Sequence, residues 1–350
     1  MNLLKSSTYT SLLKNISLDN KDMLNALDGK TVMITGASGM IGSFIADMLM
    51  YANISGMINC RVIATGRNSD RLKSRFSQYA ENDAFIPMSH DVTKEFSADE
   101  HIDCIIHAAS NADPASFSKY PVDTLLANIM GTYNLLEFCR KNGVARFVFV
   151  SSGEFYGSSE NIIGGFKESD LGKLNFSTSR VCYPEGKRSS EALCKCYETQ
   201  YGLDVISVRP CHIFGPTMTD TDSRAVSQFF RNALASKDIQ LNSPGNIERS
   251  QCYVADAAVG ILTALVYGKK GEAYNISDPA LKMTIREFAQ AVADASNTKL
   301  LFGNPSDSAV TEPVPDKRQV LDSSKLFSLG WKLCKGDKIK ETITILKEAQ

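Results

Sequence analysis

Short apolar segments alternate with segments of helical periodicity through the first two-thirds of this 350-residue chain. The apolar segments consist largely of consecutive Val, Ile, Phe and Met residues, which is typical of strands buried on both faces. Buried strands that are separated by helices form a parallel sheet with helices on both sides, so the pattern predicts an α/β fold with a doubly wound parallel sheet. The predicted strands are 31–35, 61–65, 84–88, 103–107, 146–150 and 204–208, and the longest predicted helices are 120–142 and 183–201.

A glycine-rich segment, TGASGMIG at residues 35–42, joins the first predicted strand to the first predicted helix. Glycines allow the backbone to approach a pyrophosphate, and the following helix offers it free N–H groups and a partial positive charge. This spacing between a buried strand and a helix is typical of dinucleotide-binding sites and indicates a Rossmann-like sheet; a plain tight turn is the alternative. The residues expected to hold the phosphates are Gly36, Ser38, Gly39, Met40, Ile41 and Gly42.

The segment after the second predicted strand, Gly66-Arg67-Asn68, lacks the carboxylate that usually binds the adenosine ribose of NAD. Arg67 could accommodate the extra phosphate of NADP, or it could be a solvated loop residue. Asp91, after the third predicted strand, could accept a hydrogen bond from the adenine amino group or could begin a turn. These residues by themselves leave both NAD and NADP open as the cofactor.

The alternation loosens after about Pro216, where proline and glycine become frequent. At roughly 150 residues per domain, the length accommodates two units. We expect a lead-in helix within residues 1–29, a Rossmann-like dinucleotide-binding domain over 30–215 with an insert at about 158–182, and a smaller C-terminal α/β lobe over 216–350 that mainly binds substrate. Segment 250–268 is expected to pack back on the Rossmann-like domain.

Charge and hydropathy argue against several classes of partner. The 38 Lys and Arg residues are balanced by 39 Asp and Glu residues, so no strong field exists that could hold nucleic acid or an anionic membrane. No run of about 18 apolar residues could span a bilayer, and the N-terminus lacks the features of a secretory signal. The nine cysteines are scattered without a Cys-x-x-Cys pair, which predicts reduced thiols, no metal site and a cytoplasmic protein.

Tyr183 and Lys187 are four residues apart in a predicted helix, so their side chains share one face. An ammonium group beside a phenol favours the phenolate, and we expect it to lower the pKa of Tyr183 towards neutrality. Ser152 lies just after the fifth predicted strand, at the edge where doubly wound sheets bind ligands. A tyrosine that exchanges a proton with a substrate, beside a hydroxyl that can bind the same oxygen, is suited to interconvert an alcohol and a ketone.

In combination, these motifs resemble those of the extended short-chain dehydrogenases/reductases, the NAD-dependent epimerase/dehydratase family that acts on nucleotide sugars. The resemblance extends from about Lys30 to Ile345. Besides the glycine-rich segment and the Ser152, Tyr183 and Lys187 set, it is carried by HAAS at 107–110, Asn128 within ANIMGTYNLLE, RPCHIFGP at 209–216, Arg249 before YVAD at 253–256, and Arg318 before LGW at 329–331.

The resemblance implies a role for each matching position. The catalytic set would be Ser152, Tyr183 and Lys187, and Arg249 would hold the substrate diphosphate unless it is a surface charge. His212 stands where the family usually has an asparagine, and a core histidine is the alternative. Further cofactor contacts would come from Arg67, Asp91, Val92, Ala108, Ala109, Ser110, Asn128, Tyr183, Lys187 and Pro210, and substrate contacts from Ser152, Glu154, His212, Arg224, Arg249 and Arg318.

Members of this family are expected to oxidise a sugar hydroxyl, usually at C4, to a transient ketone, after which their reactions differ. Glu154, two residues after Ser152, matches the Thr-Ser-Glu signature of UDP-glucuronate decarboxylases and the Thr-Asp-Glu signature of dehydratases. Gly153 replaces the dehydratase Asp, and the pair Lys317-Arg318 is similar to the decarboxylase segment that supplies an arginine near the sugar carboxylate. We therefore hypothesise a UDP-glucuronate decarboxylase-like enzyme acting on a UDP-linked sugar. A 4-epimerase, a 4,6-dehydratase and a non-catalytic dinucleotide-binding regulator are the alternatives.

Helices 120–142 and 183–201 follow the pattern by which members of this family pair across a two-fold axis as a four-helix bundle. An apolar stripe runs along the first of these helices and consists of Leu125, Ile129, Leu136 and Cys139. The stripe predicts a homodimer, although packing within the same chain would explain it equally well.

Overall fold

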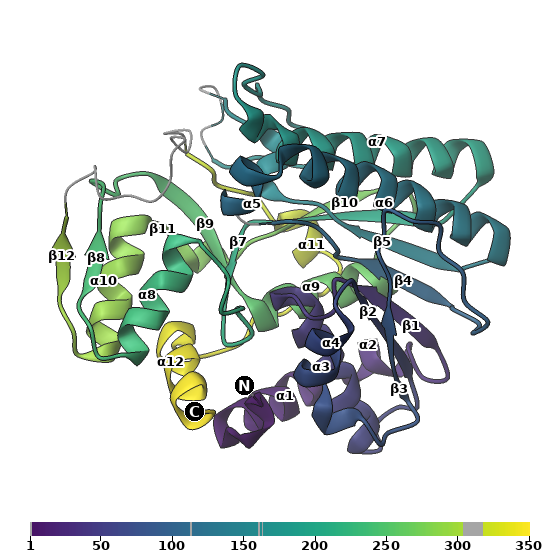
Figure 1. Cartoon of the computed structure of the whole chain (residues 1–350), viewed down its shortest axis with the longest axis horizontal. Helices are drawn as coiled ribbons and strands as arrows, with labels where there is room; N and C mark the ends of the chain where they lie inside the picture. The colour runs from purple at the N-terminus through teal and green to yellow at the C-terminus, as the bar shows by residue number, and fades with distance from the viewer. Residues whose placement is uncertain (1, 113, 160–161, 163, 304–317) are drawn as a thin grey trace.

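The computed structural model describes residues 2–112, 114–159, 162, 164–303 and 318–350. Its centre is a seven-stranded sheet in the order β10-β6-β5-β4-β1-β2-β3, in which every neighbouring pair is parallel (Figure 1). The predicted doubly wound, Rossmann-like sheet is therefore confirmed. Its strands are β1 (Thr31–Thr35), β2 (Arg61–Gly66), β3 (Phe85–Ser89), β4 (Cys104–His107), β5 (Arg146–Val150), β6 (Val205–Pro210) and β10 (Ala273–Ile276).

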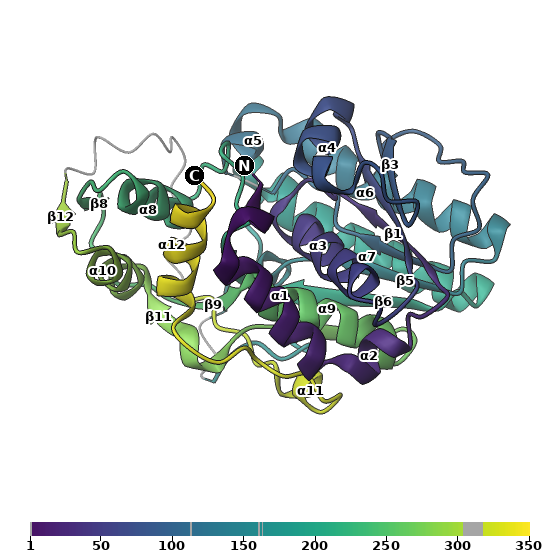
Figure 2. The same cartoon turned by 90° about the horizontal axis from the view of Figure 1, so that it is seen from below.

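Alternate residues of the strands belong to two hydrophobic cores, one on each face of the sheet. In β1, Val32 and Ile34 belong to one core and Met33 to the other. Because successive side chains of a strand point to opposite faces, a strand between two cores must be apolar throughout. The first core is covered by α3 (Met40–Ile54) and α9 (Val254–Tyr267), and the second by α6 (Pro121–Asn142) and α7 (Cys182–Tyr201), on opposite sides of the sheet (Figures 1 and 2).

The strand order reverses between β1 and β4. From β1 the chain runs outwards through β2 to β3, and it then returns to β4 on the other side of β1. Such a reversal leaves a crevice at the carboxyl ends of the central strands, where doubly wound folds bind their ligands. The glycine-rich segment lies at this edge, because it connects the carboxyl end of β1 to α3.

A smaller group of elements packs beside the central sheet (Figure 1). It contains a three-stranded sheet in the order β11-β9-β7 and a pair of strands, β12 and β8. The chain beyond residue 216 also supplies β10 to the central sheet and α9, which packs on α3, β5 and β6. The bounds in this group are β7 (His212–Phe214), α8 (Ala225–Leu234), β8 (Ile239–Leu241), β9 (Glu248–Tyr253), β11 (Lys282–Thr284), α10 (Ile285–Ser296), β12 (Leu300–Phe302) and α12 (Lys338–Glu348).

Helix α1 (Ser7–Asp19) lies between α3 and the C-terminal helix α12 (Figure 2). The hydroxyl of Tyr9 donates a hydrogen bond to Asp47 of α3 (2.7 Å between Oη and Oδ2), and Glu348 of α12 accepts one from Ser6 (2.7 Å). The N-terminal segment therefore supports the helix that follows the glycine-rich segment. The remaining short elements are η1 (Leu3–Lys5), α2 (Lys21–Asn25), α4 (Ser69–Arg75), η2 (Ser77–Tyr79), α5 (Pro114–Lys119), η3 (Gly153–Tyr156), η4 (Ser179–Val181), η5 (Pro279–Leu281) and α11 (Ser324–Phe327).

Helix α6 has one buried face and one exposed apolar face. Leu136 and Cys139 of the predicted stripe are buried in the core between α6 and the sheet, and Leu125 packs against a cluster that contains Tyr183. Packing within the chain therefore accounts for these members of the stripe. A different row of apolar side chains is exposed, three or four residues apart, and consists of Val122, Leu126, Met130 and Tyr133.

The described part of the chain lacks two kinds of feature. No helix in it combines the length and the apolar character needed to cross a bilayer. Within the same residues, no group of three or more His, Cys, Asp or Glu side chains is placed to hold a metal ion. All nine cysteines belong to this part and are free thiols.

Candidate active site

A cleft of about 690 Å³ opens at the carboxyl ends of the central strands, where a doubly wound sheet is expected to bind ligands. It extends from the glycine-rich segment, past the ends of β4 and β5, to the strands of the smaller group. The residues of the sequence analysis that line it are Gly36, Ser38, Gly39, Met40, Ile41, Gly42, Arg67, Asp91, Val92, Ala108, Ala109, Ser110, Ser152, Glu154, Tyr183, Lys187, Pro210, His212, Arg224 and Arg249. Asn128 and Arg318 are not among the lining residues.

The glycine-rich segment turns tightly against the end of β4. Gly36 has a φ of +66°, in the left-handed region that favours glycine. A Cβ atom at Gly36 would lie 2.8 Å from the carbonyl oxygen of Ala108, so the close approach of the two backbones requires glycine. Gly39 is the N-cap of α3, and no side chain caps the helix there. The first N–H groups of α3 and its positive end are therefore suited to hold a pyrophosphate.

Polar residues also line the cleft beside the glycine-rich segment, in the loops that follow β2 and β3. Arg67 is exposed and donates a hydrogen bond to Asn111 (3.1 Å between Nη2 and Oδ1). Asp91 accepts hydrogen bonds from the backbone N–H and the hydroxyl of Thr93. Burial acts to raise the pKa of Asp91, but these hydrogen bonds and the charge of Arg67 hold the pKa below its usual value. The charged carboxylate of Asp91 and the uncapped N-terminus of α3 are together suited to contact a dinucleotide.

Tyr183, Lys187 and Ser152 converge at the middle of the cleft. Tyr183 and Lys187 lie one turn apart on α7, and Ser152 follows β5. The ring of Tyr183 stacks on Phe117 of α5, with 4.5 Å between the ring centroids. The Nζ atom of Lys187 donates a hydrogen bond to the carbonyl oxygen of Val150 at the end of β5 (2.8 Å). These contacts hold the phenol and the amine beside the end of the strand.

The expectation that the pKa of Tyr183 is lowered towards neutrality is wrong for this structure. Burial raises the pKa of Tyr183 to about 12, although a hydrogen bond with Ser152 acts in the opposite direction. Burial also lowers the pKa of Lys187 to about 7, because Glu191 offsets only part of the cost of a charged amine without water. The spacing of the two residues shows that they share a helix face, but it does not show that both are removed from solvent.

We expect the stability of the unliganded protein to depend on pH through Lys187. The amine has a pKa of 10.5 when unperturbed and about 7 in the folded chain. Between these values the unfolded state binds more protons, so the contribution of Lys187 to the free energy of unfolding increases as the pH rises from about 7 to about 10. Urea unfolding of the natural chain and of Lys187→Met at about pH 7 and pH 9 measures this, and the free energy of unfolding of the natural chain should increase relative to that of the variant. Equal increases in both proteins would contradict the assignment.

Glu154 lies in η3, two residues after Ser152, and lines the cleft. Arg180 of η4 forms an ion pair with it, with 2.6 Å between Nη2 and Oε1. The guanidinium of Arg180 also lies over the ring of Phe117, 5.4 Å from its centroid. Arg180 is not among the site residues predicted from the sequence. Its position three residues before Tyr183, about one helical turn away, was the available signal.

The cleft reaches β7 and β9 at His212 and Arg249. These residues lie on neighbouring strands, with 3.3 Å between Nε2 of His212 and Nη1 of Arg249. Burial, together with the charge of Arg249, lowers the pKa of His212 to about 3, so the imidazole is neutral. Arg224 is oriented by Asp222 (2.6 Å between Nη2 and Oδ2). Two guanidinium groups beside a neutral imidazole suit an anionic ligand such as a diphosphate.

Asn128 contacts the lining of the cleft from behind. It is buried in α6, and its side-chain oxygen accepts a hydrogen bond from the hydroxyl of Ser110 (3.0 Å), which lines the cleft. Its amide group donates to the carbonyl oxygen of Thr124 (2.7 Å). Asn128 therefore orients Ser110 in the unliganded chain.

Arg318 is directed away from the cleft. It pairs with Glu248 (2.7 Å between Nε and Oε2) and donates to the carbonyl oxygen of Ile162. Its neighbour Gln319 pairs with β9 through a β-bridge and lines the cleft. Successive residues of an extended segment point to opposite sides, so the two side chains diverge. Lys317 lies outside the described residues.

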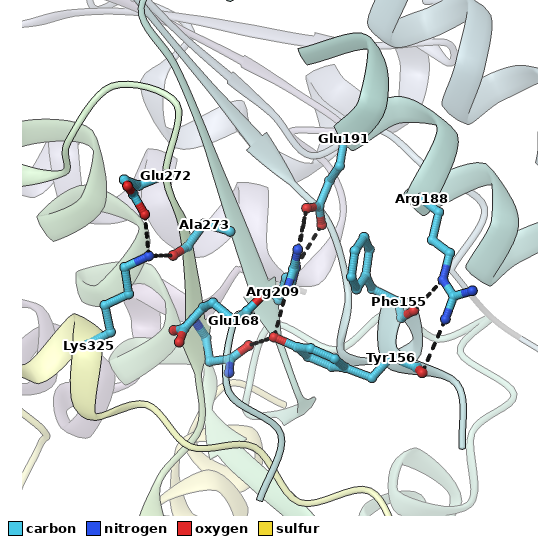
Figure 3. Close-up of polar contacts among 10 residues, drawn as sticks. Phe155, Tyr156, Glu168, Arg188, Glu191, Arg209, Glu272, Ala273 and Lys325 are labelled. Atoms are coloured by element: carbon cyan, nitrogen blue, oxygen red, sulfur yellow. Dashed lines mark hydrogen bonds and ion pairs between the residues drawn. The ribbon is translucent and has the colours of Figure 1, made fainter. Parts of the chain in front are cut away.

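A buried polar network links η3 to α7 behind the cleft (Figure 3). Arg209 of β6 pairs with Glu191 of α7 (2.8 Å between Nη2 and Oε2) and donates to the hydroxyl of Tyr156 in η3 (2.8 Å). Arg188 of α7 donates to the carbonyl oxygens of Phe155 and Tyr156. The network holds η3 in place relative to α7. The sequence analysis assigned no role to these side chains, because their partners are far away along the chain.

Comparisons with known proteins find relatives in sequence and in fold. A family model described as the NAD dependent epimerase/dehydratase family matches residues 32–277. UDP-glucuronic acid decarboxylase 6 of Arabidopsis thaliana is 30% identical over 321 residues, which cover 91% of this chain and 88% of the relative. The solved dTDP-glucose 4,6-dehydratase DesIV of Streptomyces venezuelae has a TM-score of 0.75 at 22% identity, covering 91% of this chain and 97% of that one. The UDP-glucuronic acid 4-epimerase of Bacillus cereus, solved with UDP-glucuronic acid and NAD, has a TM-score of 0.74 at 22% identity, covering 91% and 100%.

Proposed function

Because this chain belongs to the NAD-dependent epimerase/dehydratase family, we propose that it binds NAD and removes the carboxyl group of a UDP-linked glucuronate. The observation that carries the proposal is the position of Glu154. Its carboxylate, paired with Arg180, lines the same cleft as Ser152 and Tyr183. Further support comes from the UDP-glucuronic acid decarboxylase that is 30% identical over 91% of the chain.

Binding is divided between the two parts of the chain. The glycine-rich segment, the positive end of α3 and Asp91 would hold NAD, which would supply the hydride acceptor and donor; residues 30–215 contain most of this site. Arg249, His212 and Arg224 hold the diphosphate of the nucleotide sugar, and residues 216–350 contain most of that site. Arg67 lies where NADP would carry its extra phosphate, so the mass of the cofactor that accompanies the purified protein decides between the two dinucleotides.

Tyr183 accepts the proton of the C4 hydroxyl while the hydride leaves C4. Ser152 donates a hydrogen bond to the same sugar oxygen and so orients it towards the phenol. The phenol must first lose its own proton, and an ammonium group at Lys187 favours that loss. Burial of Tyr183 keeps water from competing for the proton.

A ketone at C4 makes the C6 carboxylate part of a β-keto acid. When the C5–C6 bond breaks, its electron pair moves into the C4 carbonyl group, carbon dioxide leaves, and the resulting enolate takes up a proton at C5. Hydride then returns to C4 and Tyr183 returns its proton to the C4 oxygen, which gives a UDP-linked pentose. Glu154 binds the sugar hydroxyl groups and so holds the C5–C6 bond in line with the π orbitals of the carbonyl group.

The alternative functions account less completely for the groups in the cleft. A dehydratase requires an acid for the departing 6-hydroxyl group, and Gly153 stands at the position of the dehydratase aspartate. A Cβ atom at Gly153 would lie 3.2 Å from Cδ1 of Leu321, so this position is closely packed. A simple 4-epimerase requires no carboxylate at Glu154. A regulator without activity requires no convergence of Ser152 with Tyr183.

Incubation of the purified protein with NAD and UDP-glucuronate tests the proposal. We expect release of carbon dioxide and formation of a UDP-linked pentose, measured by gas capture and by mass spectrometry. Turnover of a neutral nucleotide hexose without turnover of UDP-glucuronate would reject decarboxylation. An inverted C4 hydroxyl in the product would then favour an epimerase, and loss of water would favour a dehydratase.

We also propose that the chain forms a homodimer through α6 and α7. The exposed row on α6, which contains Leu126 and Met130, is the surface that supports this. Leu126→Glu combined with Met130→Glu is expected to give a monomer, because two charges would lose their water at the interface. Light scattering after size exclusion at micromolar concentration measures the mass. Lys141→Glu, at the end of the same helix, is the control and should stay dimeric, whereas a monomeric natural chain would reject the dimer.

A reducing, cytoplasmic location is the final part of the proposal. It is supported by the free thiols at all nine cysteine positions, since disulfides are typical of oxidising compartments. Fractionation of cells that produce the protein tests the location. Recovery in a secreted fraction would contradict it.

A further inference from the structure

Arg180 lies at the proposed reaction centre without a role of its own. Its side chain is 13% exposed and lines the cleft. The guanidinium pairs with Glu154 and lies over Phe117, whose ring stacks on Tyr183. This cation and the phenol that acts on the sugar therefore contact the same aromatic ring.

The covalent structure of a hexuronate determines where its carboxylate must lie. C6 is bonded to C5, and C5 is bonded to C4. When the C4 hydroxyl lies at Tyr183, the carboxylate lies beside the phenol, in the part of the cleft that Glu154 borders. Two carboxylates in the same part of the cleft, those of Glu154 and of the sugar, repel each other unless a cation binds both. A guanidinium can do so, because its planar group carries several N–H donors.

The other cations of this part of the cleft are engaged differently in the described structure. Arg224 is held by Asp222 through two of its nitrogens. Arg249 lies beside His212 on β7 and β9, and Lys187 donates to the end of β5. Arg180 is thus the arginine that is paired with a side chain of the reaction centre itself.

We propose that Arg180 recognises the carboxylate of the sugar and selects a hexuronate over a neutral hexose; the inference rests on the proposed function. In the unliganded chain Glu154 holds the guanidinium in position, and in the complex the guanidinium bridges Glu154 and the sugar carboxylate. Arg318, which the sequence analysis placed near that carboxylate, pairs with Glu248 instead. Loss of carbon dioxide removes the group that Arg180 binds, so the product is held less tightly than the substrate.

Binding of UDP-glucuronate and UDP-xylose to the NAD-loaded protein tests the inference, since these ligands differ only in the carboxylate. Every protein carries Tyr183→Phe, which prevents turnover during the calorimetric titration. This parent protein should bind UDP-glucuronate about ten- to a hundredfold more tightly than UDP-xylose, because the carboxylate adds charge-assisted hydrogen bonds. Arg180→Met should abolish the preference. Arg180→Lys should retain part of it, because an ammonium supplies the charge without the planar pair of donors.

A double variant distinguishes two roles of Arg180: recognition of the sugar carboxylate and neutralisation of the charge of Glu154. Arg180→Met with Glu154→Gln removes both charges of the pair and leaves the net charge of the cleft unchanged. If Arg180 binds the sugar carboxylate, the double variant also lacks the preference; if the preference returns, Arg180 only neutralises Glu154 and the inference is wrong. Arg286→Met is the control, because Arg286 donates to the carbonyl oxygen of Pro244 and does not line the cleft. Thermal melts establish that each variant is folded.

Failure of the inference can be distinguished from failure of the proposed function. Release of carbon dioxide by the natural chain tests the function alone. A preference that depends on Arg180, without such release, supports the inference and rejects decarboxylation. Release of carbon dioxide together with a preference that survives Arg180→Met, or with no preference in the parent protein, overturns the inference and leaves the function standing.

Discussion

Tyr183→Phe is expected to lower kcat for UDP-glucuronate by about 10²- to 10⁴-fold while the affinity for NAD stays unchanged. The substitution removes the phenolic oxygen that accepts the proton of the C4 hydroxyl in the proposed mechanism. The phenylalanine ring keeps the stack on Phe117, whose centroid lies 4.5 Å from that of Tyr183, so the cleft keeps its shape. Release of carbon dioxide measures kcat, and calorimetry measures binding of NAD.

Tyr197→Phe is the matched control for this experiment. Tyr197 lies on the same helix, but its hydroxyl donates to Glu137 (2.7 Å) and it does not line the cleft. Loss of the Tyr197 hydroxyl should leave kcat unchanged. Natural turnover by Tyr183→Phe would show that another group accepts the proton. Binding of NAD without turnover, in the natural chain and in Tyr183→Phe alike, would favour a dinucleotide-binding regulator.

Glu154→Gln is expected to suppress release of carbon dioxide by about 10²-fold, because a small displacement of the sugar misaligns the bond that must break. The amide has the size of the carboxylate but carries no charge, so it loses the ion pair with Arg180. The glycine-rich segment is untouched, and binding of NAD should therefore stay intact. Steady-state kinetics and the NAD content of the purified variant measure the two effects.

Glu185→Gln provides the comparison for Glu154→Gln. Glu185 lies on α7, two residues after Tyr183, and does not line the cleft. The Glu185→Gln variant should release carbon dioxide at the natural rate. Equal rates for both variants would remove Glu154 from the mechanism, whereas loss of NAD from Glu154→Gln would mean that the residue supports the fold of the cleft.

The central strands could be predicted closely from local pattern. The segment 146–150 is a strand with those bounds, and the expected strand 204–208 is found at Val205–Pro210. The last strand of the sheet, Ala273–Ile276, was missed. It is short and lies where the alternation loosens, and it becomes a strand by pairing with β6, which lies far away along the chain.

Local motifs predicted residues that share one cleft, whereas they carried no information about the environment of each side chain. The glycine-rich segment, Ser152 and Tyr183 carry their signal in neighbouring residues, and they line one cleft. The pKa of Tyr183 depends on burial, which raises it instead of lowering it. Arg318 occurs in a motif of the family but is directed to Glu248, because the extended segment that carries it alternates its side chains.

The amino-acid sequence by itself determined the class of the fold, the tight glycine turn after β1 and the shared helix of Tyr183 and Lys187. Each depends on spacing over a few residues, where backbone geometry leaves little choice. Only the tertiary structure decided that Arg180 pairs with Glu154, that the phenol and the amine lack water, and that the exposed row on α6 differs from the predicted one. Ion pairs, desolvation and exposure depend on segments that meet only after folding, and local spacing carries no information about them.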